Sequence, residues 1–288
     1  MKGIILAGGS GTRLWPTTKS VSKQLLPIYD KPLIYYPLST LMLAGINEIL
    51  IITTPSDQNN FKNLLGDGTQ FGISLKYEVQ IEPNGLAQAF VIGSQFIANE
   101  SVSLILGDNL FYGSGLSDLM KNALTNSSAH IFTYEVSNPQ DYGIVFLDEL
   151  GNPIRVEEKP ASAKSNLAIT GLYFFNNEVV EIAKKVKPSA RGEFEITSVI
   201  EHYLKEGNLS ISTLSRGMAW LDTGSSKTLH DAASFVRVIE ERTGTKIGCI
   251  EEVAWRNGWI NSDQLYKLGT FLEKSEYGKY LQNLVLSN

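Results

Sequence analysis

The pattern of apolar and polar positions divides the chain into three parts, and the first part alternates between two kinds of segment. Short apolar runs rich in β-branched residues are typical of buried strands, whereas apolar residues every three or four positions are typical of helices. The expected strands are Lys2–Ala7, 48–54, 75–79 and 103–106, and the expected helices are 37–44, 59–65 and 86–97. Strands that alternate with helices form βαβ units, so we predict an α/β fold with a mostly parallel central sheet and helices on both faces.

The second and third parts have different patterns. Strand-like segments joined by short Asn, Pro and Gly connections predict antiparallel pairing, and they lie at 129–136, Gly143–Leu147, 154–158 and 168–175. Helical spacing then dominates at 226–242, 250–257, 262–272 and 275–286, and Ser225 or Ser226 can cap the first of these helices. Since no linker-like stretch separates the parts, we expect one domain over residues 1–288, with an α/β core at 1–225 and a helical extension at 226–288.

The composition is that of a folded globular protein, because 43% of the 288 residues are hydrophobic and 19% are charged. A single cysteine, Cys249, excludes an internal disulfide and favours a reducing compartment. The N-terminal apolar run is too short for a signal peptide, and no uncharged stretch supplies the roughly 18 apolar residues of a membrane span. We therefore expect a cytoplasmic protein without a membrane partner.

The charged residues are nearly balanced, with 25 Lys and Arg against 30 Asp and Glu and a formal net charge of −5. Non-specific binding of nucleic acid depends on a positive field, so we expect no nucleic-acid partner. The total leaves room for a local cluster of positive side chains inside a cleft.

A glycine-rich loop, GGSGTR at residues 8–13, follows the first expected strand directly. Three glycines in four positions allow a tight turn that brings backbone N–H groups near an anion, and Arg13 adds a positive fork for phosphate oxygens. Leu14 stands where a dinucleotide-binding loop needs its third glycine, and the loop lacks the Gly-Lys-Ser/Thr end of a Walker loop. An ordinary turn is the alternative, but we favour a phosphate-binding loop with Lys23 as a second cation.

Two aspartates, Asp108 and Asp222, each follow an apolar segment and stand in a turn that contains glycine. Either one alone is a common turn former. Ligands of α/β sheets bind beyond the carboxyl ends of the strands, and a carboxylate pair there can hold Mg²⁺ together with water and substrate phosphates. The triplet Asp-Thr-Gly at 222–224 also matches aspartic proteases, but a single-chain enzyme of that kind needs a second triplet, which this chain lacks.

The residues around these positions resemble one protein family over essentially the whole chain. The strings that carry the resemblance are GGSGTRL (8–14), SKQLLP (22–27), NGLAQAF (84–90), LILGDNLFYG (104–113), VEEKP (156–160), RGEFEIT (191–197) and WLDTG (220–224). In this order they are similar to the nucleotidyltransferases that activate sugar 1-phosphates and, more narrowly, to the members that transfer a thymidylyl group. The resemblance implies a Rossmann-like nucleotide-diphospho-sugar transferase fold with an antiparallel sugar-binding region and a helical C-terminal extension.

The resemblance also implies roles for individual residues. The implied nucleotide-binding residues are Leu6, Gly8, Gly9, Gly11, Thr12, Gln80 and Gly85, the last two at the pyrimidine edge. The implied sugar-phosphate residues are Asn109, Tyr142, Gly143, Glu158, Lys159, Ile169 and Trp220. Arg13, Lys23, Asp108, Lys159 and Asp222 are implied to be catalytic, with Asp108 and Asp222 holding Mg²⁺. For Glu158 and Lys159 the alternative is a solvated charge run, and for Trp220 it is packing in the core.

The reaction implied by the resemblance joins dTTP and α-D-glucose 1-phosphate to give dTDP-glucose and pyrophosphate. It proceeds by Mg-dependent in-line attack of the sugar phosphate on the α-phosphorus and is the first step of dTDP-deoxysugar synthesis, for example of dTDP-rhamnose. The family further implies a homotetramer and feedback inhibition by a dTDP-deoxysugar. Two alternatives stay open: a UTP-using uridylyltransferase, since one methyl group discriminates by only about 1–3 kcal/mol, and a non-catalytic sugar-nucleotide sensor.

Overall fold

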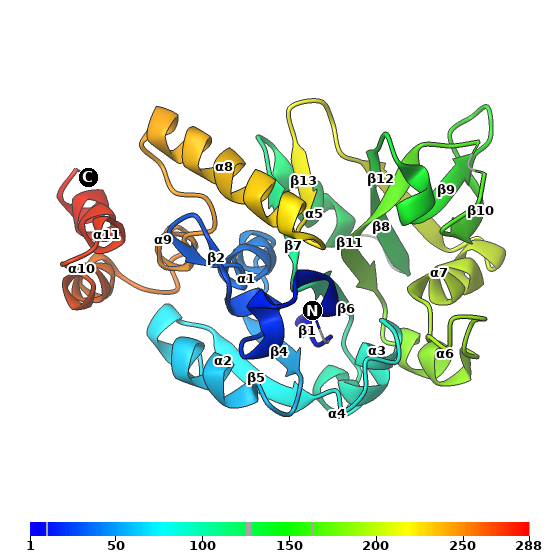
Figure 1. The fold of residues 1–288 in the computed structure, drawn as a ribbon, viewed down its shortest axis with the longest axis horizontal. Coiled ribbons are helices and arrows are strands. Elements are labelled where there is room, and N and C mark those ends of the chain that lie inside the picture. Colours follow the sequence, from blue (N-terminus) through cyan, green and yellow to red (C-terminus); the bar gives the residue numbers. More distant parts are fainter. Residues whose placement is uncertain (10, 125–127, 163, 288) are drawn as a thin grey trace.

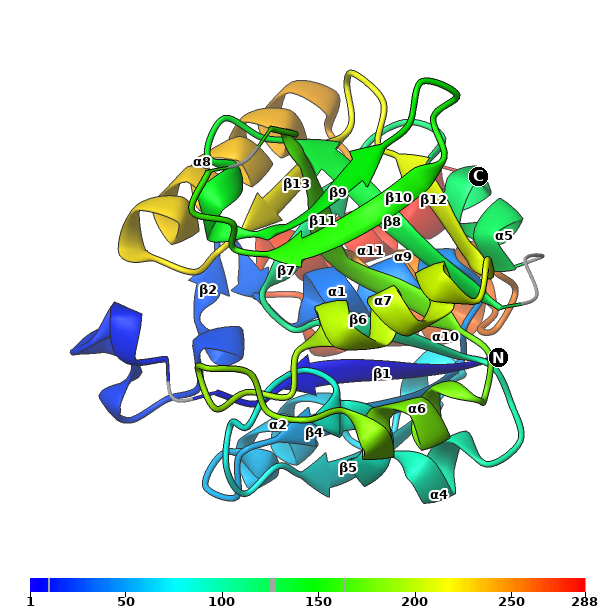
Figure 2. The same ribbon diagram turned by 90° about the vertical axis from the view of Figure 1, so that its right-hand side faces the viewer.

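One sheet runs through the centre of the computed structural model, which describes residues 1–9, 11–124, 128–162 and 164–287 (Figures 1 and 2). Within these ranges nine strands belong to the sheet. From one edge they are β5 (Ser74–Val79), β4 (Glu48–Thr53), β1 (Lys2–Ala7), β6 (Val102–Leu106), β11 (Leu167–Phe175), β9 (Gly143–Leu147) and β10 (Pro153–Glu158), with β8 (Ala129–Glu135) beside β11 and β12 (Leu209–Thr213) beside β8. The first four are parallel neighbours, and antiparallel pairing begins at β11. The predicted α/β fold with an antiparallel middle region is confirmed.

Helices cover both faces of the sheet. One core contains side chains from α1 (Tyr35–Leu43), α2 (Gln58–Leu65), α5 (Leu116–Leu124) and α9 (Ile250–Arg256), and the other contains side chains from α3 (Gln88–Ile92), α4 (Ser94–Ile97), α6 (Val179–Lys185) and α7 (Ile196–Lys205). Along β1, Ile5 and Ala7 belong to the first core, whereas Ile4 and Leu6 belong to the second. Neighbours along a strand point to opposite faces, so a strand buried on both sides is apolar throughout, as this run is.

The predicted strands and helices of the first part are confirmed to within two residues at their ends, with one exception. Segment 86–97 forms α3 and α4 in place of one helix, and the break falls at Gly93. A Cβ at Gly93 would lie 2.9 Å from Ile4 Cδ1, so glycine permits close packing on β1 at a cost in helix propensity. The elements that the pattern missed are α5, α6, α7, β12 and two small sheets, β2 (Pro27–Ile28) with β3 (Lys31–Pro32) and β7 (Asn109–Tyr112) with β13 (Ala219–Asp222).

The C-terminal helices are α8 (Ser226–Thr243), α9, α10 (Ser262–Phe271) and α11 (Glu276–Leu286). Ser225 caps α8 as expected, because its Oγ accepts from Thr228 N at 3.1 Å while Ser225 N donates to Thr228 Oγ1 at 3.0 Å. Figure 1 shows α10 and α11 at the end of the molecule opposite to α7 and β10. The core that contains α1 continues into α9, α10 and α11 through Ile250, Leu265 and Leu281. None of the described helices combines the length and the apolar character that crossing a membrane requires.

A buried ion cluster joins α8 to the β2–β3 hairpin. Glu240 is 6% exposed and Lys31 is 4% exposed, and Glu240 Oε1 lies 2.9 Å from Lys31 Nζ. The other carboxylate oxygen of Glu240 lies 2.8 Å from Lys246 Nζ, and Ile247 N donates to Glu240 Oε1 at 2.9 Å. Both charges are therefore paired and hydrogen-bonded, which is the condition for tolerating charge in a core.

Replacing Glu240 by alanine is expected to lower the free energy of unfolding by about 3 kcal/mol, because the buried ammonium of Lys31 keeps only Asp30 as a carboxylate partner, at 2.5 Å, and Ile247 N loses its acceptor. Urea unfolding measures this loss. The matched control is Glu241→Ala, since Glu241 is 51% exposed and pairs with Arg237 at 3.0 Å, an exposed pair whose loss costs less than about 1 kcal/mol. Equal losses in the two variants would contradict the assigned role of the cluster.

Candidate active site

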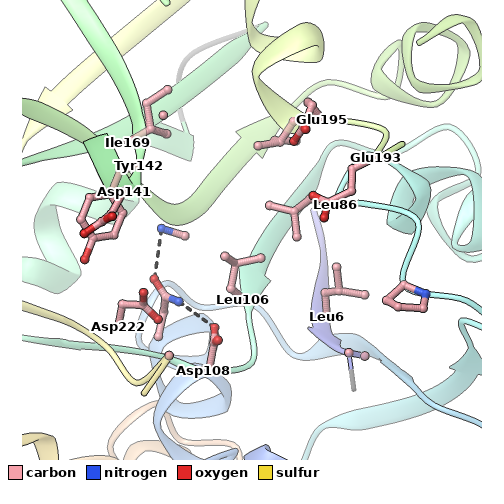
Figure 3. Close-up of a pocket in the computed structure, with 18 of the residues that line it drawn as sticks. Leu6, Leu86, Leu106, Asp108, Asp141, Tyr142, Ile169, Glu193, Glu195 and Asp222 are labelled. Carbon is pink, nitrogen blue, oxygen red and sulfur yellow. Dashed lines mark hydrogen bonds between the residues drawn. The ribbon is translucent and has the colours of Figure 1, made fainter. Parts of the chain in front are cut away.

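A cavity of about 540 Å³ opens beyond the carboxyl ends of β1 and β6 (Figure 3). The glycine loop after β1 forms one side, and the other side comes from β9, β10, β11 and the segment that leads into α7. Figure 3 shows Asp108 near Asp222 in one part of the cavity, with Glu193 and Glu195 across from them. The residues named from the sequence that line it are Leu6, Gly8, Gly9, Gly11, Thr12, Arg13, Lys23, Asp108, Asn109, Tyr142, Gly143, Glu158, Lys159, Ile169, Trp220 and Asp222.

The glycine loop needs glycine at two of its turns. Gly11 has φ 58° and Gly9 has φ 114°, backbone conformations that side chains with a Cβ rarely adopt. Thr18 fixes the loop by donating its hydroxyl to the carbonyl oxygen of Gly11 at 2.7 Å. A 3₁₀ turn, η1 (Thr12–Leu14), then presents Arg13 to the cavity, and a second, η3 (Lys23–Leu25), presents Lys23. These two turns thereby bring Arg13 and Lys23 to the cavity at the end of β1.

The small β7–β13 sheet explains why the two aspartates meet. In its register Asp222 lies opposite Asn109, the residue after Asp108. Thr223, directly after β13, holds this strand next to Asp108. Its backbone N donates to the Asp108 carbonyl oxygen at 3.2 Å, and its Oγ1 donates to the same oxygen at 2.9 Å. Lys23 Nζ contacts Asp108 Oδ2 directly. Residues 108 and 222, distant in sequence, thus share one site with a lysine.

The carboxylates of Asp108 and Asp222 repel each other, and a further positive charge between them would relieve this repulsion. Burial, and then the negative charge of Asp108, raise the pKa of Asp222 to about 6, although Lys23 and Arg13 oppose the rise. Among the described residues no group of three or more His, Cys, Asp or Glu is placed to hold a metal ion. Two carboxylates whose repulsion a cation would relieve, with remaining positions left to phosphates and water, fit a divalent metal such as Mg²⁺.

Asn109 is held inside the protein, beneath the cavity. It is 2% exposed, and its Oδ1 accepts from Trp220 Nε1 at 2.5 Å and from Gly171 N at 3.2 Å. Its Nδ2 donates to Asp108 Oδ1 at 2.8 Å, so the amide orients the carboxylate. Trp220 both packs and lines the cavity, with its ring centroid 5.1 Å from that of Tyr142. Trp220 therefore packs in the core as one alternative expected, and its contact with the sugar stays a prediction.

Arg191 is a cavity residue that the sequence analysis did not single out. It contacts Glu193 directly, and its guanidinium lies 3.6 Å from Glu158 and 3.5 Å from Glu195. Burial, and then the neighbouring charge of Glu195, raise the pKa of Glu158, which is only partly offset by Lys159 and Arg191. An arginine among alternating acidic residues is typical of a solvated surface, so the local sequence held no signal for this position.

Gln80 and Gly85 do not line the cavity directly. Gln80 is 4% exposed, and its Oε1 lies 2.6 Å from where a Cβ on Gly8 would stand, so it is just behind the cavity wall. Gly85 has φ 113°, and a Cβ there would come within 2.5 Å of the Phe194 backbone. Phe194 N also donates to the Asn84 carbonyl at 2.7 Å. The loop that carries Gly85 is thus packed against the segment that carries Arg191.

Phosphate groups and a divalent cation are the ligands that this cavity suits, which places the protein among the phosphate-transferring α/β enzymes. Within that class the chain belongs to the nucleotidyl transferase family, whose model matches residues 2–238. It is 54% identical over 286 residues to a glucose-1-phosphate thymidylyltransferase of Neisseria meningitidis serogroup A, covering 99% of both chains. It is also 54% identical over 288 residues to the glucose-1-phosphate thymidylyltransferase of Mycobacterium tuberculosis, covering 100% of both.

Two solved structures have the same fold. One, described as a glucose-1-phosphate thymidylyltransferase from Bacillus anthracis in complex with sucrose, has a TM-score of 0.76 at 37% identity and covers 82% of this chain and 95% of that chain. The other, a UDP-glucose pyrophosphorylase complexed with UDP-glucose, has a TM-score of 0.73 at 26% identity and covers 83% and 98%. Of these two structures, the one from Bacillus anthracis has both the higher sequence identity and the higher TM-score.

Proposed function

We propose that the chain transfers the thymidylyl group of dTTP to α-D-glucose 1-phosphate and releases pyrophosphate. The observation that carries the proposal is the 54% identity, over the full length, to relatives described as glucose-1-phosphate thymidylyltransferases. The site supports it, because the charged residues expected from the sequence line one cavity. A sensor without activity would have no need of this set.

The bonds that form and break in this reaction determine what the protein must contribute. A bond forms between a phosphate oxygen of the sugar phosphate and the α-phosphorus of dTTP, while the bond from that phosphorus to pyrophosphate breaks. The attacking phosphate is ionised near neutral pH, so no protein nucleophile is needed. Since two polyanions must approach each other, the protein contributes positive charge and orientation. We assign Arg13 and Lys23 to the leaving pyrophosphate, and Lys159 and Arg191 to the sugar phosphate.

The sugar pocket is assigned to the side of the cavity formed by β9, β10 and β11. Glu158 would accept hydrogen bonds from sugar hydroxyl groups, beside Tyr142 and Ile169. A Cβ on Gly143 would lie 3.0 Å from Thr197 Cγ2 and 3.3 Å from Glu158 Oε2, so glycine keeps this corner open. Asn109 would act mainly by orienting Asp108, since its amide is already used inside the protein.

We assign the metal to Asp108 and Asp222 and propose that it is Mg²⁺. When bound, the ion supplies positive charge to the nucleotide phosphates. The contact with Lys23 holds the Asp108 side chain in place, and the hydrogen bonds from Thr223 hold the backbone at Asp108 against β13. The protein thus presents two carboxylates for the metal, with Lys23 in direct contact with one of them.

The test offers dTTP, UTP, CTP, ATP and GTP separately with glucose 1-phosphate and Mg²⁺, and follows pyrophosphate release. We expect the highest kcat/KM with dTTP, a value for UTP lower by about 10- to 200-fold, as one methyl group allows, and no release in EDTA. If none of the five nucleotides gave pyrophosphate release, the proposal would be contradicted and the sensor would be favoured. A preference for UTP would identify a uridylyltransferase, and undiminished activity in EDTA would remove the metal site.

We further propose a cytoplasmic homotetramer that a dTDP-deoxysugar inhibits. The buried single thiol of Cys249 suits a reducing compartment. Sedimentation analysis tests the tetramer, and inhibition of pyrophosphate release by dTDP-rhamnose tests the feedback.

A further inference from the structure

Gln80 stands at the point where the end of β5 meets the glycine loop. Its backbone N donates to the Thr53 carbonyl at 2.9 Å, which fixes the main chain against β4. Its side-chain Nε2 donates twice, to the Gly85 carbonyl at 3.3 Å and to Gln88 Oε1 at 2.8 Å. The two donors of the amide are therefore both used within the protein.

These contacts fix which end of the amide faces the cavity wall. The Gly85 carbonyl can only accept a hydrogen bond, so the NH₂ end of Gln80 must lie there and Oε1 must point the other way. Oε1 faces Gly8, which lines the cavity, and it accepts no hydrogen bond from any residue that the structure describes. Among the described residues, Ser103 Oγ is the one fully buried side-chain N or O atom without a hydrogen bond. Since Gln80 Oε1 also lacks a hydrogen bond but is not such an atom, part of its surface is exposed.

An unpaired carbonyl oxygen at this place distinguishes bases by their hydrogen-bonding edge. Thymine and uracil carry an N3–H, which donates to such an oxygen. Cytosine has a lone pair at N3, which an oxygen repels. If the amide of Gln80 were turned over, its NH₂ group would face the base and the preference would reverse.

We propose that Gln88 is a positioning residue that sets this preference together with the Gly85 carbonyl. Its Oε1 accepts the shorter of the two hydrogen bonds from Gln80 Nε2, 2.8 Å against 3.3 Å, and so does most to hold the amide with its oxygen toward the base. The inference rests on the proposed nucleotidyl transfer and goes beyond it. Gln88 is the first residue of α3 and does not itself line the cavity, so it acts through Gln80. Its position is fixed because Ala87 N donates to the Phe194 carbonyl at 3.1 Å, immediately before the helix.

The experiment compares Gln88→Met with Gln88→Glu and wild type. Methionine keeps the length of the side chain but removes the acceptor, whereas glutamate retains an oxygen for Gln80 Nε2. The measurements are kcat/KM for dTTP and CTP with glucose 1-phosphate, and calorimetric binding of each nucleotide. Gln95→Met is the matched control, because Gln95 is exposed on α4 and does not line the cavity.

We expect Gln88→Met to lower kcat/KM for dTTP about tenfold and to lower the dTTP-to-CTP ratio by at least as much, as the loss of one oriented hydrogen bond allows. The KM for glucose 1-phosphate stays unchanged, Gln88→Glu restores the ratio, and Gln95→Met behaves as wild type. A wild-type ratio in Gln88→Met overturns the inference, as does an equal loss for both nucleotides that glutamate does not rescue. If the wild-type protein used neither dTTP nor CTP as a substrate, the proposed function would be wrong. The ratio of the calorimetric dissociation constants for dTTP and CTP would still test the role of Gln88.

Discussion

Asp222→Asn is expected to lower kcat by roughly 10²-fold or more while making the metal-free protein more stable at neutral pH. Activity falls because one of the two carboxylates assigned to the metal is lost. Stability rises because Asp222 is buried beside Asp108, and the amide removes their repulsion. An increase in stability together with a loss of activity separates a functional carboxylate from a structural one.

The pH dependence of this gain follows from the direction of the pKa shift. Burial and Asp108 raise the pKa of Asp222 from 3.8 to about 6, so the folded protein binds this proton more tightly than the unfolded chain does. The raised pKa therefore costs nothing below the unfolded value, and the cost grows as pH rises from about 4 to about 6 and stays constant above. Relative to wild type, Asp222→Asn is expected to gain on the order of 2 kcal/mol at pH 7.5 and little at pH 4.

Urea unfolding in EDTA at the two pH values measures the gain, and a second series with Mg²⁺ completes the test. A ligand that binds the folded state stabilises it, so Mg²⁺ should raise the stability of wild type more than that of Asp222→Asn. Asp231→Asn is the control, because Asp231 is 53% exposed on α8, where it pairs with Lys227. A variant with near-normal kcat, or one destabilised at pH 7.5, would contradict the assignment.

The fold was predictable where local pattern and burial coincide. The unbroken apolar run of β1 is a direct consequence of packing on both faces, and Ser225 could be recognised as a cap from its own neighbours. β7 and β13 were missed because each has four residues and is defined by its pairing with the other, whose residues lie between 107 and 113 positions away in the sequence. A pairing of that kind is set by the tertiary structure and leaves no periodic signal in either strand.

The site was predictable to the same extent and for the same reason. The glycine loop carries its signal in adjacent residues, so Gly11 and Arg13 could be expected at the cavity, which they line. Arg191 could not, because its environment includes Glu158 from a distant strand. The sequence also could not tell that the amides of Asn109 and Gln80 are largely used inside the protein, since hydrogen-bond partners such as Trp220 become neighbours only on folding.

Arg13 is the cation whose removal tests phosphate binding most directly. Lys23 contacts Asp108, and Arg191 is shared by three glutamates, so removing either would leave buried or half-buried carboxylates uncompensated. Arg13 is exposed at the cavity and forms no ion pair with the residues that the structure describes. Its guanidinium is therefore available to phosphate oxygens, and its loss should affect the reaction without affecting the fold.

Arg13→Ala is expected to lower kcat/KM for dTTP by roughly 10²-fold, in line with the loss of one electrostatic contributor in other enzymes, with the unfolding free energy unchanged within about 0.5 kcal/mol. Inhibition by added pyrophosphate should weaken in parallel, because the same side chain is assigned to the leaving group. Lys19→Ala is the control in the neighbouring 3₁₀ turn, η2 (Thr17–Lys19), since Lys19 is exposed, does not line the cavity, and has its Nζ 5.6 Å from the Trp15 ring centroid. The assignment would be wrong if Arg13→Ala kept its sensitivity to pyrophosphate, or if Lys19→Ala lost as much activity, because a general loss of positive charge in these turns would then explain both.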